Sequence, residues 1–310
     1  MARSFNRTIR PRQVGRLQGR RKLCKGSATM TATKLSTIRV EKPWGRRDLG
    51  AGFAAVPEGQ APVGEIWFSG AGSADQELMV KYLFTSERLS IQVHPNDAQA
   101  LAAGFGGGKE EAWIILDAEP DAVIGLGTVR PLSHAELRAA AEDGSIEQLV
   151  HWQPVKAGDI IYVPAGTVHA IGSGITLIEV QQNIDLTYRL YDYGRPRELH
   201  LDAGVAVSRA MPFVIDARIV PLGGDCLSLV QGGKFVVEQW GWSGARTLIL
   251  PVGVDGLLIP VSGSGLVDGQ SWRGGECWQI SGTAKIEIEP GADVLFAYPG
   301  PEPLRLFARS

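Results

Sequence analysis

The sequence has few cysteines and no long apolar run. Only three of its 310 residues are cysteines (Cys24, Cys226 and Cys277), and none stands in a CxxC spacing. That usage argues against a disulfide framework and favours a reducing cytoplasm. No run of 18 apolar residues occurs, so we expect no membrane-spanning helix. The net charge of −2 gives no indication of a nucleic-acid partner, and the composition is that of a globular protein with one or two domains.

Residues 1–29 lack acidic side chains altogether and differ from the rest of the chain. They contain nine Lys or Arg residues and no apolar segment of the kind found in a secretory signal. We expect a basic, disordered tail, or residues upstream of a true start at Met30. The alternative is a targeting or anion-binding arm.

Beyond residue 30 the pattern predicts a mainly β protein. Short apolar segments alternate with turns rich in Gly, Pro and Asp, which is typical of a β-sandwich or barrel. One interruption is expected to be helical, because Ser133 and Glu136 form the Ser-x-x-Glu pattern of a capping box. This pattern, with the apolar residues that follow it, predicts a helical hairpin of about twenty residues inserted in the β framework.

One stretch, residues 89–97, predicts a functional strand. Its apolar and polar residues alternate, which places Gln92 and His94 on the same face. A carboxylate in the segment 108–113 and the imidazole of His169 are available as partners. Such a set of N and O donors suits zinc or another divalent ion. The residues alone leave open whether these side chains bind a metal or are hydrogen-bonded core residues.

Four segments resemble the successive motifs of type I mannose-6-phosphate isomerases (phosphomannose isomerases), in the same order and at compatible spacing. They are residues 89–97, 108–113, 161–170 and 178–195. These enzymes are zinc-dependent cupins, and the chain is most similar to their compact bacterial form. The resemblance implies a catalytic cupin jelly roll over residues 30–205. A second, cupin-like β domain without metal would follow over residues 206–310, where no histidine occurs.

The resemblance also implies the metal ligands. It identifies Gln92, His94, Glu111 and His169 as the ligands of one Zn²⁺ ion per chain. Glu110 lies beside Glu111, but neighbouring strand residues face opposite sides, so only one of the two should reach the metal.

The remaining site residues follow from the same resemblance. It implies catalytic roles for Arg189, Glu179 and Lys109, and substrate contacts from Ser90, Lys81, Asp185 and Arg195. A sugar phosphate carries close to two negative charges, which calls for Lys and Arg side chains. Glu179 is expected to be the proton-transfer base, and a buried salt bridge between Glu179 and an arginine is the alternative. The family's usual serine before Asp185 is replaced by Ile184.

The resemblance implies a zinc-dependent aldose–ketose isomerase that interconverts mannose 6-phosphate and fructose 6-phosphate, and the cysteine usage favours a cytoplasmic location. Two alternatives remain open: a cupin isomerase of another phosphosugar, and a sugar- or metal-binding cupin without catalytic activity. We expect a phosphosugar substrate, a monomer or homodimer, and no nucleic-acid or membrane partner.

Overall fold

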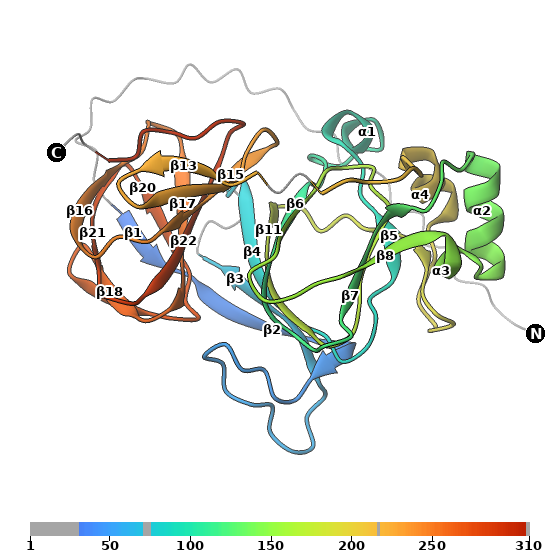
Figure 1. Ribbon diagram of the computed structural model, residues 1–310, viewed down its shortest axis with the longest axis horizontal. Helices are drawn as coiled ribbons and strands as arrows, with labels where there is room; N and C mark the ends of the chain where they lie inside the picture. Colours follow the sequence, from blue (N-terminus) through green and yellow to red (C-terminus); the bar gives the residue numbers. More distant parts are fainter. Residues whose placement is uncertain (1–30, 71–75, 216–217, 308–310) are drawn as a thin grey trace, which may run out of the picture.

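The computed structural model describes residues 31–70, 76–215 and 218–307 of a mainly β protein, as predicted (Figure 1). The expectation for the tail concerns residues 1–29, which lie outside the described part. None of the helices in that part is long and apolar enough to cross a bilayer.

The first pair of sheets is built from residues 36–191. The six-stranded sheet has the order β2-β3-β4-β11-β6-β9. Its strands are β2 (Ser36–Arg46), β3 (Val63–Ser69), β4 (Leu78–Phe84), β6 (Glu111–Ala118), β9 (Ile160–Val163) and β11 (Ile175–Gln182). The five-stranded sheet has the order β12-β5-β10-β7-β8. Its strands are β5 (Ile91–Val93), β7 (Val123–Thr128), β8 (Val150–Pro154), β10 (His169–Ile171) and β12 (Tyr188–Tyr191).

Helices cover the outer face of the five-stranded sheet. They are α2 (His134–Asp143), α3 (Ile146–Leu149) and α4 (Leu201–Val207), at one end of the molecule in Figure 1. The predicted capping box is present, because Ser133 Oγ accepts from Glu136 N while the Glu136 carboxylate accepts from Ser133 N. The helical insertion is therefore confirmed. A further short helix, α1 (Asp97–Ala102), follows β5.

The second pair of sheets contains the later strands and one early strand. The seven-stranded sheet has the order β1-β20-β17-β22-β15-β14-β13. Its strands are β1 (Thr31–Lys34), β13 (Val220–Gly223), β14 (Cys226–Val230), β15 (Phe235–Trp240), β17 (Asp255–Ser262), β20 (Trp278–Ser281) and β22 (Asp293–Pro299). The four-stranded sheet, ordered β16-β21-β18-β19, has β16 (Gly244–Ile249), β18 (Ser264–Val267), β19 (Gln270–Arg273) and β21 (Thr283–Ile288). The early strand is β1 of the seven-stranded sheet, which pairs antiparallel with β20 although the predicted division at residue 205 assigns β1 to the first half.

The two pairs of sheets share an apolar core. Residues from the outer face of the six-stranded sheet, such as Val80 and Tyr82, pack in one cluster with Val237 and Leu295 of the seven-stranded sheet. Because side chains alternate along β4, Lys81 points the opposite way, into the first sandwich. Strands that are apolar on one face thus direct charged groups into a buried interior on the other.

Candidate metal centre and adjoining cavity

Three side chains meet between the first two sheets. His94 follows β5 and His169 begins β10, where its Cα pairs with that of Gln92. Glu111 opens β6 on the facing sheet. One ligand atom from each of His94, Glu111 and His169 lies within 4.8 Å of the others, and all three residues are at most 2% exposed. The predicted convergence of two histidines with the carboxylate in residues 108–113 is confirmed.

Both imidazoles are oriented by backbone carbonyls. His94 Nδ1 lies 2.9 Å from Leu186 O, and His169 Nδ1 lies 2.8 Å from Thr167 O, so each Nδ1 carries the proton and donates it. Burial, with Lys109 nearby, lowers the pKa of His94 to about 3. Burial also lowers the pKa of His169. Both rings are therefore neutral at pH 7, and each Nε2 presents a lone pair.

These lone pairs face an anionic carboxylate. Burial by itself would raise the pKa of Glu111, but attraction to the Lys109 ammonium holds that pKa well below its usual value. Each histidine Nε2 is 3.3 Å from a Glu111 oxygen. Within the described residues, His94 Nε2 and both Glu111 oxygens lack a hydrogen bond, although Lys109 Nζ lies 2.9 Å from Oε2. Lone pairs so close repel unless a cation lies between them, so the cluster fits a divalent metal ion.

Gln92 borders the same cluster. Its Nε2 is 3.2 Å from His169 Nε2, while Ser90 Oγ lies 3.2 Å from its Oε1. A half-turn of the amide exchanges oxygen and nitrogen, which would bring a ligand oxygen beside His169. Gln92 is therefore placed to supply a further donor to a metal held by the other three.

A polar cavity of about 370 Å³ adjoins the cluster. Six of the predicted non-metal site residues line it: Ser90, Lys81, Lys109, Glu179, Asp185 and Arg189. Gln92 and Lys109 lie at the boundary, since both line the cavity and also contact the His94–Glu111–His169 cluster.

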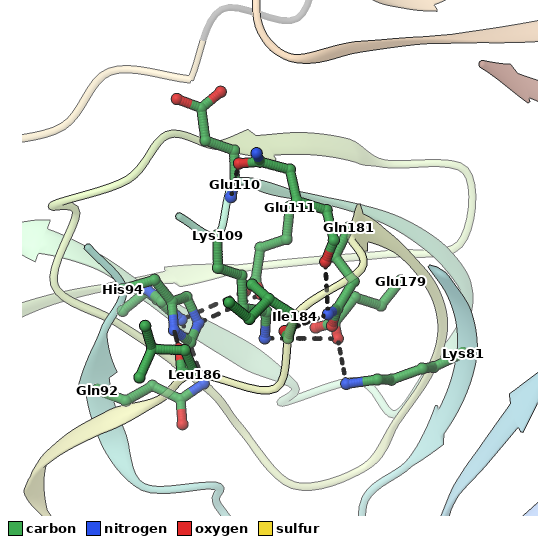
Figure 2. A network of polar contacts seen from close by, with 12 residues as sticks. Lys81, Gln92, His94, Lys109, Glu110, Glu111, Glu179, Gln181, Ile184 and Leu186 are labelled. Carbon is green, nitrogen blue, oxygen red and sulfur yellow. Dashed lines mark hydrogen bonds and ion pairs between the residues drawn. The ribbon is translucent and has the colours of Figure 1, made fainter. Parts of the chain in front are cut away.

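Glu179 is the buried carboxylate of this cavity. It is 4% exposed, and its Oε1 lies 3.4 Å from Lys81 Nζ and 3.9 Å from Lys109 Nζ (Figure 2). Trp113 Nε1 donates to its other oxygen at 3.3 Å. Burial, followed by repulsion from Glu111, raises the pKa of Glu179. The ion-pair partners are thus lysines and not the arginine considered from the sequence.

The structure places Arg189 at the cavity but not Arg195. Arg189 stands opposite Gln92 on the neighbouring strand β12. Arg195, expected to contact substrate, does not line the cavity, because its guanidinium is held 2.9 Å from Asp192 Oδ1 and donates to Arg88 O at 2.7 Å. Arg197 lines the cavity instead, with two bonds of 2.5 and 2.6 Å to Asp192.

The sequence interpretation also missed Glu65, Lys42 and His200, which line the cavity as well. Glu65 is 8% exposed and lies 3.0 Å from Lys42 Nζ. Its signal was a lone carboxylate in the apolar strand β3, the same signal that marked Glu179. For Lys42 and His200 no such signal was available, since both stand in polar surroundings.

Comparison with known proteins confirms the resemblance drawn from the motifs. No protein-family model matches the chain. It is 41% identical over 182 residues to "Mannose-6-phosphate isomerase ManA" of Bacillus subtilis, covering 55% of this chain and 57% of that protein. It is 37% identical over 190 residues to the mannose-6-phosphate isomerase of Streptococcus mutans, covering 57% and 58%. In these alignments the chain spans somewhat more than half the length of its curated relatives.

Solved structures extend the likeness to most of the fold. The crystal structure of the mannose 6-phosphate isomerase from Bacillus subtilis matches with a TM-score of 0.73 at 26% identity, covering 86% of this chain and 99% of that one. A phosphomannose isomerase from Salmonella typhimurium shares the fold, with a TM-score of 0.66 at 15% identity. The similarity to mannose-6-phosphate isomerases therefore includes the region after residue 205.

Proposed function

We propose that this chain is a metal-dependent isomerase that interconverts mannose 6-phosphate and fructose 6-phosphate. The observation that carries the proposal is the position of Glu179, a buried carboxylate of raised pKa that faces the cavity beside the His94–Glu111–His169 cluster. The relatives named above support this activity over other chemistry on the same fold.

The reaction moves one proton between neighbouring carbons of the open-chain sugar. Glu179 removes the proton from C2 of the aldose to give an enediol and returns it to C1, while the O2 hydroxyl proton passes to O1. A carboxylate with a raised pKa is a stronger base than an ordinary one, which suits this role. Arg189, at the opposite wall, stabilises the negative charge that develops on the enediolate oxygens. Lys109, beside both carboxylates, contributes a second positive charge near the reacting carbons.

The phosphate is recognised by the cationic side chains of the cavity. Lys81 and Arg189 line it together with Lys42 and Arg197, and Ser90 adds a hydroxyl donor. Arg197 replaces Arg195 in this proposal, because Arg197 lines the cavity and its guanidinium is oriented by a two-point contact with buried Asp192. Asp185 is available for a sugar hydroxyl.

His94, Glu111, His169 and Gln92 would hold one Zn²⁺ ion, since two imidazole nitrogens and carboxylate or amide oxygens form a borderline-hard donor set. When bound, the metal supplies Lewis-acid polarisation of the sugar oxygens.

The proposal also includes a cytoplasmic location and a monomeric or dimeric state. The location is suggested by the free cysteines Cys226 and Cys277.

A coupled isomerase assay in both sugar directions tests the function. We expect turnover of mannose 6-phosphate and fructose 6-phosphate, loss of activity on chelation, and recovery when zinc is added back. Turnover of a different phosphosugar alone would favour the alternative hypothesis of a cupin isomerase that acts on another phosphosugar. Binding of metal and phosphosugar without turnover would establish a non-catalytic cupin.

A further inference from the structure

The segment that carries Lys109 and Glu111 has an outer face as well as an inner one. Lys109 and Glu111 point towards the metal cluster, whereas Glu110 between them points the opposite way (Figure 2). Outside, the Glu110 carboxylate accepts a hydrogen bond from Tyr162 Oη of the neighbouring strand β9. The outer contacts thus hold the backbone from which two inner site residues project.

The same segment is tied to the start of α1. Asp97 Oδ1 accepts from Gly108 N at 2.8 Å and from Gln182 Nε2 at 3.1 Å. Gln182 in turn accepts from Glu110 N at 3.0 Å through its Oε1. Asp97, Gln182 and Tyr162 therefore contact residues 108–111 from outside the cavity at three points.

This network extends into the second pair of sheets. The turn of residues 231–234 joins β14 to β15, and Lys234 Nζ lies 2.6 Å from Asp97 Oδ2. This contact is the largest of the causes that lower the pKa of Asp97 to about 2. Lys234 N also lies 3.4 Å from Tyr162 Oη, and the Phe235 and Tyr162 rings meet edge to face at 5.8 Å.

Gly233 fits this turn for a steric reason. A Cβ built at Gly233 would lie 1.7 Å from Tyr162 Oη, far inside contact distance. Its φ is not in the left-handed region, so the demand for glycine comes from the closeness of Tyr162 and not from backbone conformation. Any larger residue would displace the phenol that bonds Glu110.

We propose that the turn 231–234 positions the segment 108–111, so that the second pair of sheets holds Lys109 and Glu111 in place through Tyr162, Glu110 and Asp97. Gly233 and Lys234 are then positioning residues for a site that neither of them touches. The proposal rests on the proposed function for the catalytic role of Lys109 and for the metal that Glu111 would hold, whereas the contacts themselves exist whatever the substrate.

Two variants remove the Tyr162–Glu110 hydrogen bond and the Lys234–Asp97 ion pair separately. Tyr162→Phe deletes the hydroxyl that bonds Glu110, and Lys234→Met deletes the charge that pairs with Asp97 while keeping the length of the side chain. Lys234→Arg keeps the charge and should restore the parent behaviour. Lys285→Met is the matched control, because Lys285 pairs with Glu287 at 2.8 Å on β21 of the four-stranded sheet.

The readouts are the zinc dissociation constant, measured by chelator competition, and hydrogen exchange at the amides of Gly108 and Glu110. For Tyr162→Phe we expect zinc binding weaker by roughly tenfold, the lower end of the range for partners that orient metal ligands. Lys234→Met should weaken it less, because the ion pair is partly exposed. Both variants should accelerate exchange at the two amides, and the control should change neither quantity.

Unchanged zinc affinity and amide exchange in both variants would overturn the inference, even if the melting temperature fell. Gly233→Ala, if it folds, should reproduce the effect of Tyr162→Phe. These readouts do not require turnover, so a chain without isomerase activity would contradict the proposed function while leaving this inference to be judged on its own.

Discussion

Glu179 is the residue on which the proposed chemistry most depends. Glu179→Gln keeps the size of the side chain but removes the base, so kcat should fall by about 10²-fold or more. The zinc content should stay unchanged, because Glu179 is not among the three clustered residues. Glu142→Gln on the exposed face of α2 is the control, and parent-like kcat in Glu179→Gln would refute the assignment.

The pH dependence of the parent protein gives a second test of Glu179. A protonated Glu179 cannot accept the C2 proton. Because the pKa of Glu179 is raised, kcat should decline with falling pH already above pH 4.5, as a pH–rate profile would show.

Arg189 can be separated from a simple phosphate anchor by kinetics. A lysine at this position keeps the charge but lacks the planar fork, so Arg189→Lys should remain impaired. Loss of one such donor typically costs on the order of 10²–10³ in kcat. Steady-state measurements of kcat and KM decide the matter. A rise in KM with kcat unchanged would show that Arg189 only binds the phosphate.

His94 offers a test of the metal centre by itself. Its Nδ1 is occupied by Leu186 O, so Nε2 is the atom left for a metal. His94→Ala should therefore lose bound zinc, as measured by elemental analysis after dialysis. His134→Ala should retain the metal, because His134 is an exposed residue at the start of α2. Equal zinc content in the two variants would contradict the ligand assignment.

Among the elements, the turn between β9 and β10 leads directly into His169, the first residue of β10, and so sets its position. Gly166 in this turn has φ +85°, and its N–H donates to His94 O at 2.8 Å, which joins the segments of the two histidines. A Cβ at residue 166 would lie 2.9 Å from Arg209 Nε, and a residue with a side chain would be strained at this φ.

Gly166→Ala should consequently destabilise the fold by about 1–2 kcal/mol, the usual cost of a left-handed residue with a side chain. A drop of a few degrees in melting temperature, about 2–4 °C per kcal/mol for a large domain, would be its sign. Gly106→Ala is the matched control, since a Cβ at Gly106 meets nothing within 4 Å. Equal melting temperatures for the two variants would show that the turn tolerates a side chain.

Elements were predictable where a local pattern carried the information. Alternation in residues 89–97 placed Gln92 and His94 on one face, and the Ser133–Glu136 pair marked the start of α2 correctly. Period-2 alternation also predicted correctly that Glu110 and Glu111 face opposite sides, while the selection of Glu111 came from the family resemblance. Arg195 was misplaced because one of the contacts that turn it away, its hydrogen bond to Arg88 O, joins residues 107 positions apart and is not visible in the local sequence.

At the scale of the whole molecule, the pairing of β1 with β20 could not be read from the sequence. The two strands are separated by more than 240 residues, and nothing in the four residues of β1 indicates a partner. The division into domains at residue 205 remains a prediction, and β1 shows that at least one strand lies on the other side of it.

This pairing gives a sharp comparison between two shortened chains. A chain beginning at Met30 should keep the parent melting temperature and kinetics, whereas one beginning at Leu35 should lose stability. The second lacks β1, which exposes the edge of β20 and removes the 2.5 Å ion pair between Lys34 and Glu276. Lost pairings worth about 0.5–1.5 kcal/mol each should lower the melting temperature measurably. Identical melting curves for the two chains would mean that β1 contributes nothing to the fold.

The apolar cluster shared by the six- and seven-stranded sheets limits how this protein could be recombined. Its members come from both halves, including fully buried Ile66 and Ile178 on one side and Phe235 and Ile259 on the other. A first half cut free would present that apolar sheet face to water, an aggregation hazard. The two halves therefore cannot be exchanged independently between proteins of this fold. A chimaera would have to replace both apolar faces of this shared cluster together, and it would have to take β1 from the same protein as the later strands.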